Sequence, residues 1–475
     1  MERICKIIEK DEEEWVVFNP DFNQELTPEV INFLSKHQRV EFGEKFNQSV
    51  DNLPESIIHL KFGNNFNQEV KNLPDSLINL EFGTYFNQPI CFYIKFFQNE
   101  ENLTNNNTSP IIFCCLPNKI THLKFGSYFD QPVDNLPQSL THLKFGEDFN
   151  QPVCYHTTIS QNGKSPTLLP QSLTHLTFGI DFNKPVDKLP DSLTHLKFGN
   201  QFNQPVNNLP QSLTDLTFGE VFNQPVTYQT DSSQNGKSPT LLQNSLTHIK
   251  FGWSFNQHVD NLPESLTHLE LGNKFNQQID NLPPSLTHLK FSFLSEFNQP
   301  VDNIPESLTH LEFGKEFNQH VDNLPNSLTY LEFGNQFNQP VNNLPQSLTH
   351  LQFGWIFNQP VDISDEDSPT GKSSILPKSL THLTFGDCFN TSIVKYPNSL
   401  THLSFGKSFN KILFAYNNKK KGEKIPILPD SMTHIKLKRK KYNKPIIFIP
   451  TSLKKIEISH RYEYELPDNI EVIKI

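Results

Sequence analysis

The sequence has few of the residues that favour long helices, binding to polyanions or insertion into membranes. Ala415 is the only alanine among 475 residues, and because alanine is the strongest helix former, we expect few long helices. Only 19% of the residues are charged and the formal net charge is -11, so no global basic field attracts nucleic acid or an anionic membrane. No apolar run approaches the roughly 20 residues that span a bilayer. We therefore expect no nucleic-acid partner and no membrane association.

Cysteine is also sparse, and its spacing excludes a disulfide or zinc framework. No two cysteines form a C-x-x-C pair, which indicates reduced thiols. The first residues, Met1 to Glu14, are charged and do not resemble a secretory signal. We expect an intracellular, cytoplasmic protein without cofactors. The six cysteines are Cys5, Cys91, Cys114, Cys115, Cys154 and Cys388.

What the chain does contain is one motif of about twenty residues, repeated from residue 53 to residue 411. A clean copy is Leu136–Val153, with the sequence LPQSLTHLKFGEDFNQPV. We number the motif from the leucine that follows the serine, so that Leu140 is position one. A fixed period of this length is typical of a solenoid, in which each coil buries its apolar side only by stacking on its neighbours.

Within one coil, the segment Thr141–Phe145 alternates polar and apolar residues with a period of two. This pattern predicts a strand with one buried face. We expect Leu143 and Phe145 to point inward, Phe149 and Val153 to close the core from the opposite wall, and positions three and five to face solvent. Stacked coils would then form one long parallel sheet.

Three other positions of the coil suggest backbone roles. Glycine follows the strand in fifteen coils, from Gly43 to Gly406, where we expect a sharp turn. The Leu-Pro pair predicts an extended, polyproline-like return limb. Asparagine recurs at position eleven, where its amide would satisfy backbone groups of the turn in coil after coil; examples are Asn47, Asn67, Asn87 and Asn150.

The predicted fold is therefore an all-β-rich repeat solenoid, similar to the leucine-rich repeats, with one long parallel sheet, extended return limbs and few helices. Position six can be followed through nineteen coils, from Phe18 to Ile458. We expect an N-terminal cap and degenerate first coil in residues 1–41, the solenoid in 42–435, and degenerate C-terminal coils and a cap in 436–475. The caps would include a short helix from Thr27 to about Ser35 and a final strand within Leu466–Ile475.

Five insertions interrupt the repeat, all between position fourteen and the next Leu-Pro or its equivalent, so we expect them to emerge along one edge or the back of the solenoid. Three contain Gly-Lys-Ser, but the glycine that a phosphate-binding loop needs five residues earlier is replaced by Thr158, Asp231 and Glu366. Ser165, Ser238 and Ser368 precede proline and fit either proline-directed phosphorylation or ordinary loop punctuation. The insertions span residues 91–115, 154–168, 227–241, 362–375 and 412–427.

The motif Leu-Pro-x-Ser-Leu-x-x-Leu-x-Phe-Gly-x-x-Phe-Asn-Gln-Pro, as in Leu209–Pro225, resembles the FNIP-repeat family, which is related to the leucine-rich repeats. The resemblance covers roughly residues 15 to 460 and implies the amoebal or amoeba-virus type. Some family members carry an N-terminal F-box that recruits a ubiquitin ligase. Here Phe18 and Phe22–Gln24 already belong to a degenerate first coil, and no F-box is recognisable.

Histidine fills position three in thirteen coils, out of eighteen histidines in the chain. One interpretation is metal capture or pH sensing by a column of imidazoles. The other is a consensus residue that duplication spread over a solvated face, and it is favoured because a flat column gives a metal no closed ligand set. The basic run Lys436–Lys441 resembles a nuclear import signal, but we interpret it as a solvated strand and turn.

Specificity in a repeat protein is expected where its columns deviate from the consensus. Position three is broken by Asn79, Asp215 and Tyr330, and position five changes from mainly lysine in the early coils to glutamate in the middle. Aromatic and charged residues of this kind are common in interface hot spots. The predicted partner-binding residues are Asp215, Trp253, Glu270, Glu312, Tyr330, Glu332 and Trp355.

No nucleophile, base and orienting group can be assembled from the repeat, so the sequence predicts no enzyme. The function it favours is a protein–protein interaction scaffold, monomeric, presenting an extended repeat surface to an unknown protein partner. The alternative is a substrate-recognition subunit of a ubiquitin ligase without a recognisable F-box.

Overall fold

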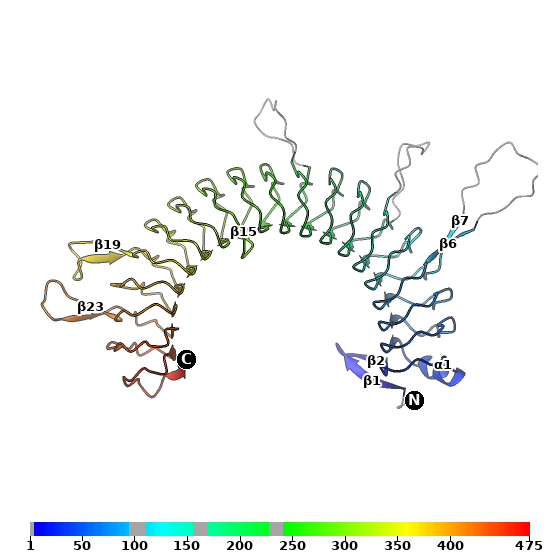
Figure 1. Ribbon diagram of the computed structural model, residues 1–475, viewed down its shortest axis with the longest axis horizontal. Helices are drawn as coiled ribbons and strands as arrows, with labels where there is room; N and C mark the ends of the chain where they lie inside the picture. Colours follow the sequence, from blue (N-terminus) through cyan, green and yellow to red (C-terminus); the bar gives the residue numbers. More distant parts are fainter. Residues whose placement is uncertain (1–3, 95–110, 155–168, 228–240) are drawn as a thin grey trace, which may run out of the picture. The chain divides into compact units, whose positions relative to one another are not determined.

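The computed structural model describes residues 4–94, 111–154, 169–227 and 241–475. The chain divides into two compact units, of which unit 1 comprises residues 1–226 and 241–246 and unit 2 comprises residues 227–240 and 247–475. Both units are stacks of β-coils, and in each the strands line the concave side of the stack (Figure 1). The predicted solenoid is confirmed.

Unit 1 contains nine strands in one parallel sheet, extended at its N-terminal edge by an antiparallel strand. The register places position three opposite position three in successive coils, as in the pairing of His142 with His175. The strands are β1 (Cys5–Lys10), β2 (Glu13–Phe18), β3 (Arg39–Glu41), β4 (His59–Lys61), β5 (Asn79–Glu81), β8 (His122–Lys124), β9 (His142–Lys144), β10 (His175–Thr177), β11 (His195–Lys197) and β12 (Asp215–Thr217).

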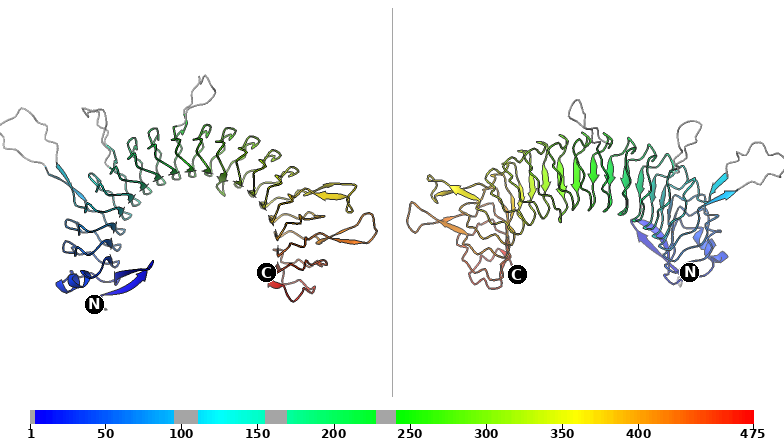
Figure 2. Two further views of the ribbon diagram at one scale, coloured as in Figure 1. Left: turned by 180° about the vertical axis from the view of Figure 1, so that it is seen from behind. Right: turned by 45° about the horizontal axis from the view of Figure 1, so that its top comes forward.

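Unit 2 contains eleven strands with the same parallel pairing, and Figure 2 shows them side by side. Together the units hold twenty parallel strands, in agreement with nineteen predicted coils and a final half-coil. The strands are β13 (His248–Lys250), β14 (His268–Leu271), β15 (His288–Phe291), β16 (His310–Glu312), β17 (Tyr330–Glu332), β18 (His350–Gln352), β21 (His382–Thr384), β22 (His402–Phe405), β25 (His434–Leu437), β26 (Lys455–Ile458) and β27 (Glu471–Lys474).

The core of each coil is built from the apolar positions that the sequence predicted. Leu143, Phe145, Phe149 and Val153 are all buried. The ring of Phe149 stacks on that of Phe145 at a centroid distance of 3.7 Å and lies 6.1 Å from that of Phe182 in the next coil. Two neighbouring columns of phenylalanine therefore run along the interior of each unit, and each coil supplies part of the core of the next.

The glycine at position seven is required for a reason that the sequence did not reveal. The predicted sharp turn is present, since the N–H of Phe129 donates to the carbonyl of Gly126 over 3.3 Å. It does not need a left-handed glycine, because positive φ angles among the described glycines occur only at Gly371 and Gly422, which lie in insertions. Instead, a Cβ added to Gly146 would overlap the carbonyl oxygen of Gly126 in the preceding coil. The glycine column thus allows the backbones of adjacent coils to approach closely.

Polar ladders at positions eleven and twelve join successive coils. The backbone N–H of Asn87 donates to Oδ1 of Asn67 over 2.9 Å, and Gln88 Nε2 donates to the backbone oxygen of Asn67 over 3.2 Å. The same pattern repeats in most coils of both units. This confirms the predicted role of the position-eleven asparagine, because each amide satisfies a backbone donor of the following coil.

The return limb contains a turn as well as extended chain. After the extended Leu-Pro pair, the N–H of Leu140 donates to the carbonyl of Pro137 over 3.1 Å, which closes a turn. Ser139 Oγ donates to the backbone oxygen of Ile120 in the preceding coil over 2.6 Å. The serine of the motif therefore ties the return limbs together.

Both ends carry elements that cover or extend the sheet. The only helix among the described residues is α1 (Pro28–Leu34), close to the predicted segment, and it buries Val30 and Leu34. The final strand β27 is also as predicted. The sequence did not predict β1, which forms an antiparallel hairpin with β2. Both strands of this hairpin have six residues, whereas most solenoid strands have three.

Three insertions form antiparallel hairpins that were not predicted: β6 (Cys91–Ile94) with β7 (Ile111–Cys114), β19 (Asp362–Ser364) with β20 (Lys372–Ser374), and β23 (Phe414–Tyr416) with β24 (Lys424–Pro426). They project from the coils on the side away from the strands (Figure 1), as expected. The last two hairpins touch, since the N–H of Asn418 donates to the carbonyl of Pro369 over 2.7 Å. Residues 155–168 and 228–240, with Ser165 and Ser238, lie outside the described residues.

Deleting Tyr155–Leu168 is expected to leave unit 1 folded. The deletion restores nearly regular spacing between Val153 and the next coil, and strands β9 and β10 on either side of it already pair directly. Thermal unfolding and circular dichroism of the deletion variant test this prediction. An insoluble or molten product would show that the inserted residues contribute to packing.

Candidate interaction surface

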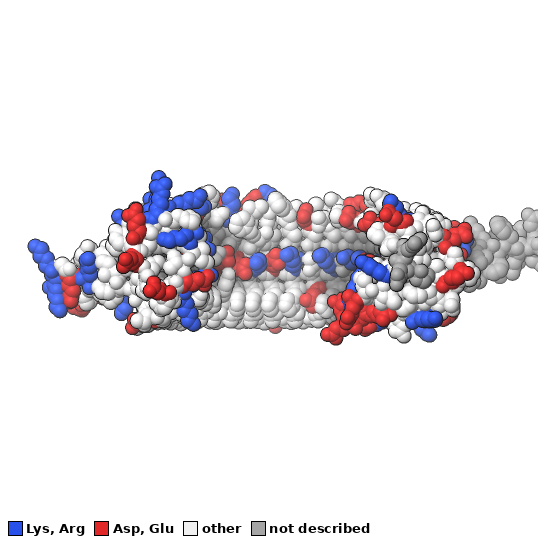
Figure 3. Space-filling model, turned by 90° about the horizontal axis from the view of Figure 1, so that it is seen from below, with Lys and Arg blue, Asp and Glu red and all other residues white. Residues whose placement is uncertain are grey.

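The strand face consists of the side chains at positions three and five, which point away from the core in both units. Figure 3 looks onto this face and shows basic side chains (blue) and acidic side chains (red) along it. Positions four and six are buried in these coils, whereas positions three and five are partly or fully exposed. In each unit, the strand face is thus a surface on which the sequence varies without disturbing the core.

Imidazoles stack along position three. In unit 1, the rings of His142 and His175 are 4.1 Å apart and nearly parallel, and the stack continues to His122 and His195. Unit 2 has two such stacks, separated at Tyr330, whose ring lies 5.8 Å from that of His310 and 6.0 Å from that of His350. The full set at position three is His59, His122, His142, His175, His195, His248, His268, His288, His310, His350, His382, His402 and His434.

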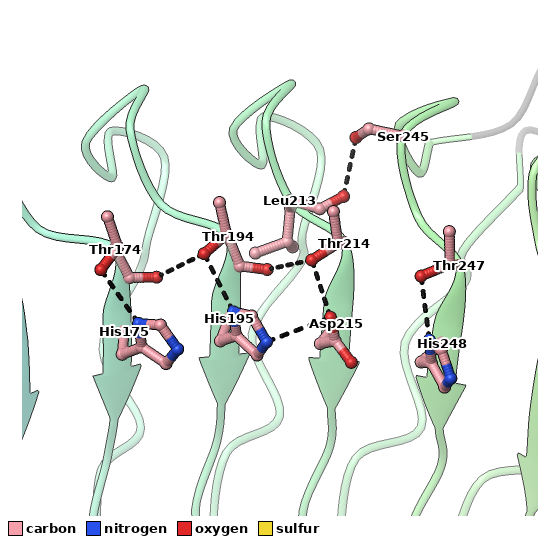
Figure 4. A network of polar contacts seen from close by, with 10 residues as sticks. All are labelled: Thr174, His175, Thr194, His195, Leu213, Thr214, Asp215, Ser245, Thr247 and His248. Carbon is pink, nitrogen blue, oxygen red and sulfur yellow. Dashed lines mark hydrogen bonds and ion pairs between the residues drawn. The ribbon is translucent and has the colours of Figure 1, made fainter.

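A threonine ladder orients these rings (Figure 4). Thr194 Oγ1 lies 3.1 Å from the backbone oxygen of Thr174 and 2.9 Å from Nδ1 of His195. The carbonyl can only accept, so the hydroxyl donates its single proton to it and accepts from Nδ1–H. The ring therefore carries a proton on Nδ1, and Nε2 is left for other partners. In His195, Nε2 lies 3.3 Å from Oδ2 of Asp215.

The environment of the column disfavours its protonation. Burial, and secondarily the charge of neighbouring imidazoles, lowers the pKa of His142 and His175 below the usual value. The same causes lower the pKa of His382 to about 4. Desolvation is the larger cause, and repulsion between neighbouring imidazoles is the smaller one.

This column predicts acid sensitivity with a defined sign. Because the folded-state pKa values are lowered, the unfolded chain binds more protons, so stability is retained above about pH 6.5 and falls as the pH drops below it. Melting temperatures at about pH 7.5 and about pH 5.5 should differ more for the wild type than for a variant with six histidines changed to glutamine. Equal acid sensitivity in the two proteins would contradict this. The six are His122, His142, His175, His288, His382 and His402, whose pKa values are all lowered.

A metal centre would need several ligating side chains arranged around one point. Among the described ranges, no group of three or more His, Cys, Asp or Glu side chains could hold a metal ion. The thiols of Cys154 and Cys388 are not joined in a disulfide. The described residues of this face contact one another through hydrogen bonds, ion pairs and ring stacking.

At position five of unit 2, lysines form ion pairs with glutamates on the neighbouring strand. Lys250 Nζ lies 2.6 Å from Oε1 of Glu270, and Lys290 Nζ lies 2.5 Å from Oε2 of Glu312. Two of the glutamates predicted to bind a partner are therefore ion-paired to the lysine of the preceding coil.

Tyr330 and Glu332, also predicted partner-binding residues, lie together on β17. The hydroxyl of Tyr330 donates to Glu332 Oε2 over 3.0 Å, and Gln352 Nε2 donates to Oε1 over 2.7 Å. Burial and the two carboxylates of Glu332 and Glu312 raise the pKa of Tyr330 to about 12. The tyrosine thus stays neutral, and its hydrogen bond to Glu332 holds the ring in place. A side chain that is already held in place loses little conformational entropy when a partner binds it.

The predicted tryptophans are exposed in the turn after the strand. Trp253 is 48% exposed and Trp355 is 57% exposed. Sequence reasoning missed Phe293, 70% exposed, and Leu294, 47% exposed, in the same turn of the β15 coil. The available signal was Phe-Ser-Phe-Leu-Ser, where the motif has Phe-Gly and two fewer residues.

Sequence reasoning also missed a hollow of about 480 Å³ on the strand face of unit 1. Trp15 of the N-terminal hairpin lines one end of it, with its ring 6.0 Å from that of His59. From there the hollow extends over positions three and five as far as His175 and Thr177. The hairpin was not predicted, and therefore neither was this hollow.

The repeat geometry agrees with comparisons to known proteins. The family model of the FNIP repeat matches eleven segments that together span most of the chain. The chain belongs to the FNIP-repeat family. The matched segments of the FNIP repeats are 46–72, 69–92, 107–148, 132–153, 165–201, 182–221, 258–293, 297–336, 320–354, 337–364 and 370–408.

A solved structure places the FNIP repeats of this chain beside a leucine-rich-repeat protein. CroV588, described as a novel circular LRR protein, is 38% identical with a TM-score of 0.68, and the match covers 94% of this chain and 69% of CroV588. YopM from Yersinia enterocolitica WA-314 is 18% identical with a TM-score of 0.45, over 97% of this chain and 86% of YopM. No curated protein matches the chain. Within the described residues, no helix is both long and apolar enough to cross a membrane.

Proposed function

We propose that this FNIP-repeat chain is a protein-interaction scaffold that binds its partner through the strand face. The observation that carries the proposal is the contrast between an invariant core and a variable exposed face. Positions four and six remain apolar, while positions three and five vary in charge and hydrogen bonding from coil to coil. Repeat proteins use surfaces of this kind for recognition.

The deviations on this face resemble interface anchors rather than catalytic groups. Tyr330 is held by Glu332, and Trp253 and Trp355 present large exposed rings in the adjoining turns. Asp215 replaces a histidine of the column and pairs with His195. Aromatic side chains held in place in this way contribute strongly to binding when a partner covers them.

Affinity capture with matched variants tests the proposal. Tyr330→Ala removes a strand-face anchor, whereas Asn326→Ala changes an exposed residue in the return limb of the same coil. We expect the first variant to capture at least about tenfold less partner than the wild type, and the second to capture as much as the wild type. Equal capture by both would contradict the proposal. Recovery of ubiquitin-ligase subunits with the wild type would specify the scaffold as a substrate-recognition subunit.

A further inference from the structure

Two lysines on the strand face of unit 1 differ from the others. Among the described residues, Lys144 and Lys197 have no carboxylate partner, although both are exposed. Their neighbours at position five are engaged, since Lys61 lies 3.3 Å from Glu41 and Lys124 pairs with Glu81. Unit 1 therefore carries two lysines on this face that form no ion pair within the described residues.

These two lysines flank a shorter residue. Thr177 lies opposite Lys144 on one side and opposite Lys197 on the other, because β9, β10 and β11 pair in register. Adjacent strands are about 4.8 Å apart, so the lysine backbones are separated by about 10 Å. We call this arrangement the lysine notch: Lys144 and Lys197 form its walls, and Thr177 is its floor. The hydroxyl of Thr177 has no partner among the described residues and can donate into the notch.

The notch lies where two depressions of unit 1 meet. The hollow of about 480 Å³ that begins at Trp15 ends at Lys144 and Thr177. A second depression, of about 580 Å³ over the glycine column, contains Lys144, Thr177 and Lys197. A ligand that lies across the strands in the first hollow would therefore place one end at the lysine notch.

We propose that the lysine notch binds carboxylates of an acidic, extended segment of the partner protein; this inference rests on the proposed function and specifies its partner. The two ammonium groups and the hydroxyl, all donors, stand on three adjacent strands, and a carboxylate supplies acceptors of opposite charge. Backbone groups of the inner strands are already used within the sheet, so recognition depends on side chains.

A long polyanion fits this surface less well than a short acidic segment. Nucleic-acid binding requires many phosphate contacts, and the notch offers two free lysines on a chain with net charge -11. The turn of the β1–β2 hairpin adds the exposed carboxylates of Asp11 and Glu12. These would repel a polyanion that continued along unit 1, while a segment with carboxylates at one end avoids them.

The experiment measures binding of fluorescent peptides to the full chain by anisotropy. The probes are peptides of about eight residues that alternate glycine with glutamate, glutamine or lysine, together with single-stranded oligothymidylate. The test variant is Lys144→Gln/Lys197→Gln. Its matched control, Lys250→Gln/Lys290→Gln, removes the same charge from the same column, but from lysines that are ion-paired in unit 2.

We expect the glutamate peptide to bind the wild type more tightly than the glutamine and lysine peptides, and added salt to weaken it. The test variant should lose about tenfold in affinity for the glutamate peptide, and the control variant much less. Equal affinity for the glutamate and glutamine peptides, equal loss in both variants, or tighter binding of oligothymidylate would overturn the inference. Partner capture that depends on Tyr330 but not on Lys144 and Lys197 would contradict the role of the lysine notch. The same result would still support the scaffold function.

Discussion

Phe149→Ala is expected to destabilise unit 1 by about 3–5 kcal/mol. The side chain is completely buried, and its ring contacts the rings of Phe145 in its own coil, Phe129 in the preceding coil and Phe182 in the next. Replacing it leaves a cavity that three coils share. Chemical denaturation gives the loss in the free energy of unfolding.

The damage should be regional, because each coil of a solenoid contacts mainly its neighbours. Amide hydrogen exchange should show reduced protection in the coils around β8, β9 and β10 and little change in remote coils. Glu147→Ala, an exposed change two residues away, is the control and should be nearly neutral. Uniform loss of protection from the first coil to the last would contradict this account.

Gly146→Ala is expected to cost at least about 3 kcal/mol, which is unusual for the addition of one methyl group. The new Cβ would overlap the carbonyl of Gly126 and approach the Cα of Ser127 in the preceding coil. Both obstacles are backbone atoms, so no side-chain rotation can make room. Adjacent strands would have to separate, which weakens the parallel ladder between β8 and β9.

A second glycine separates crowding from backbone preference. Gly422 has a φ of +84° and nothing within 4 Å of an added Cβ, so Gly422→Ala should cost only about 1 kcal/mol. Both variants are compared with the wild type by thermal unfolding. If Gly146→Ala were as mild as Gly422→Ala, close packing of the coils would not explain the glycine column.

The sequence predicted the coil because each of its features repeats. The alternation around Leu143 and Phe145 is sufficient to assign a strand and its buried face, and the period assigns parallel stacking. The reason for Gly146 could not be predicted in the same way. Its constraint is a contact with a residue twenty positions earlier, which appears only once the register between coils is known.

Features outside the repeat were harder to predict. The β1–β2 hairpin occurs once, so no period indicates it, and Trp15 could not be placed over the strand face. Pairing at position five depends on which neighbour a lysine meets: Lys250 meets Glu270, whereas Lys144 meets Thr177. The sequence contains these pairs, but only the alignment of strands identifies which lysines remain unpaired.

Site-specific photo-cross-linking tests most directly whether the strand face binds the partner. A photoreactive phenylalanine analogue is placed at Thr177 or Gln352 on the strand face, or at Asp191 or Asn326, which are exposed in the return limbs. Each variant is irradiated in cells that express it, and the adducts are identified by mass spectrometry. The account predicts that a partner is cross-linked from the strand-face positions and not from the return limbs. Adducts from the return limbs alone would contradict it.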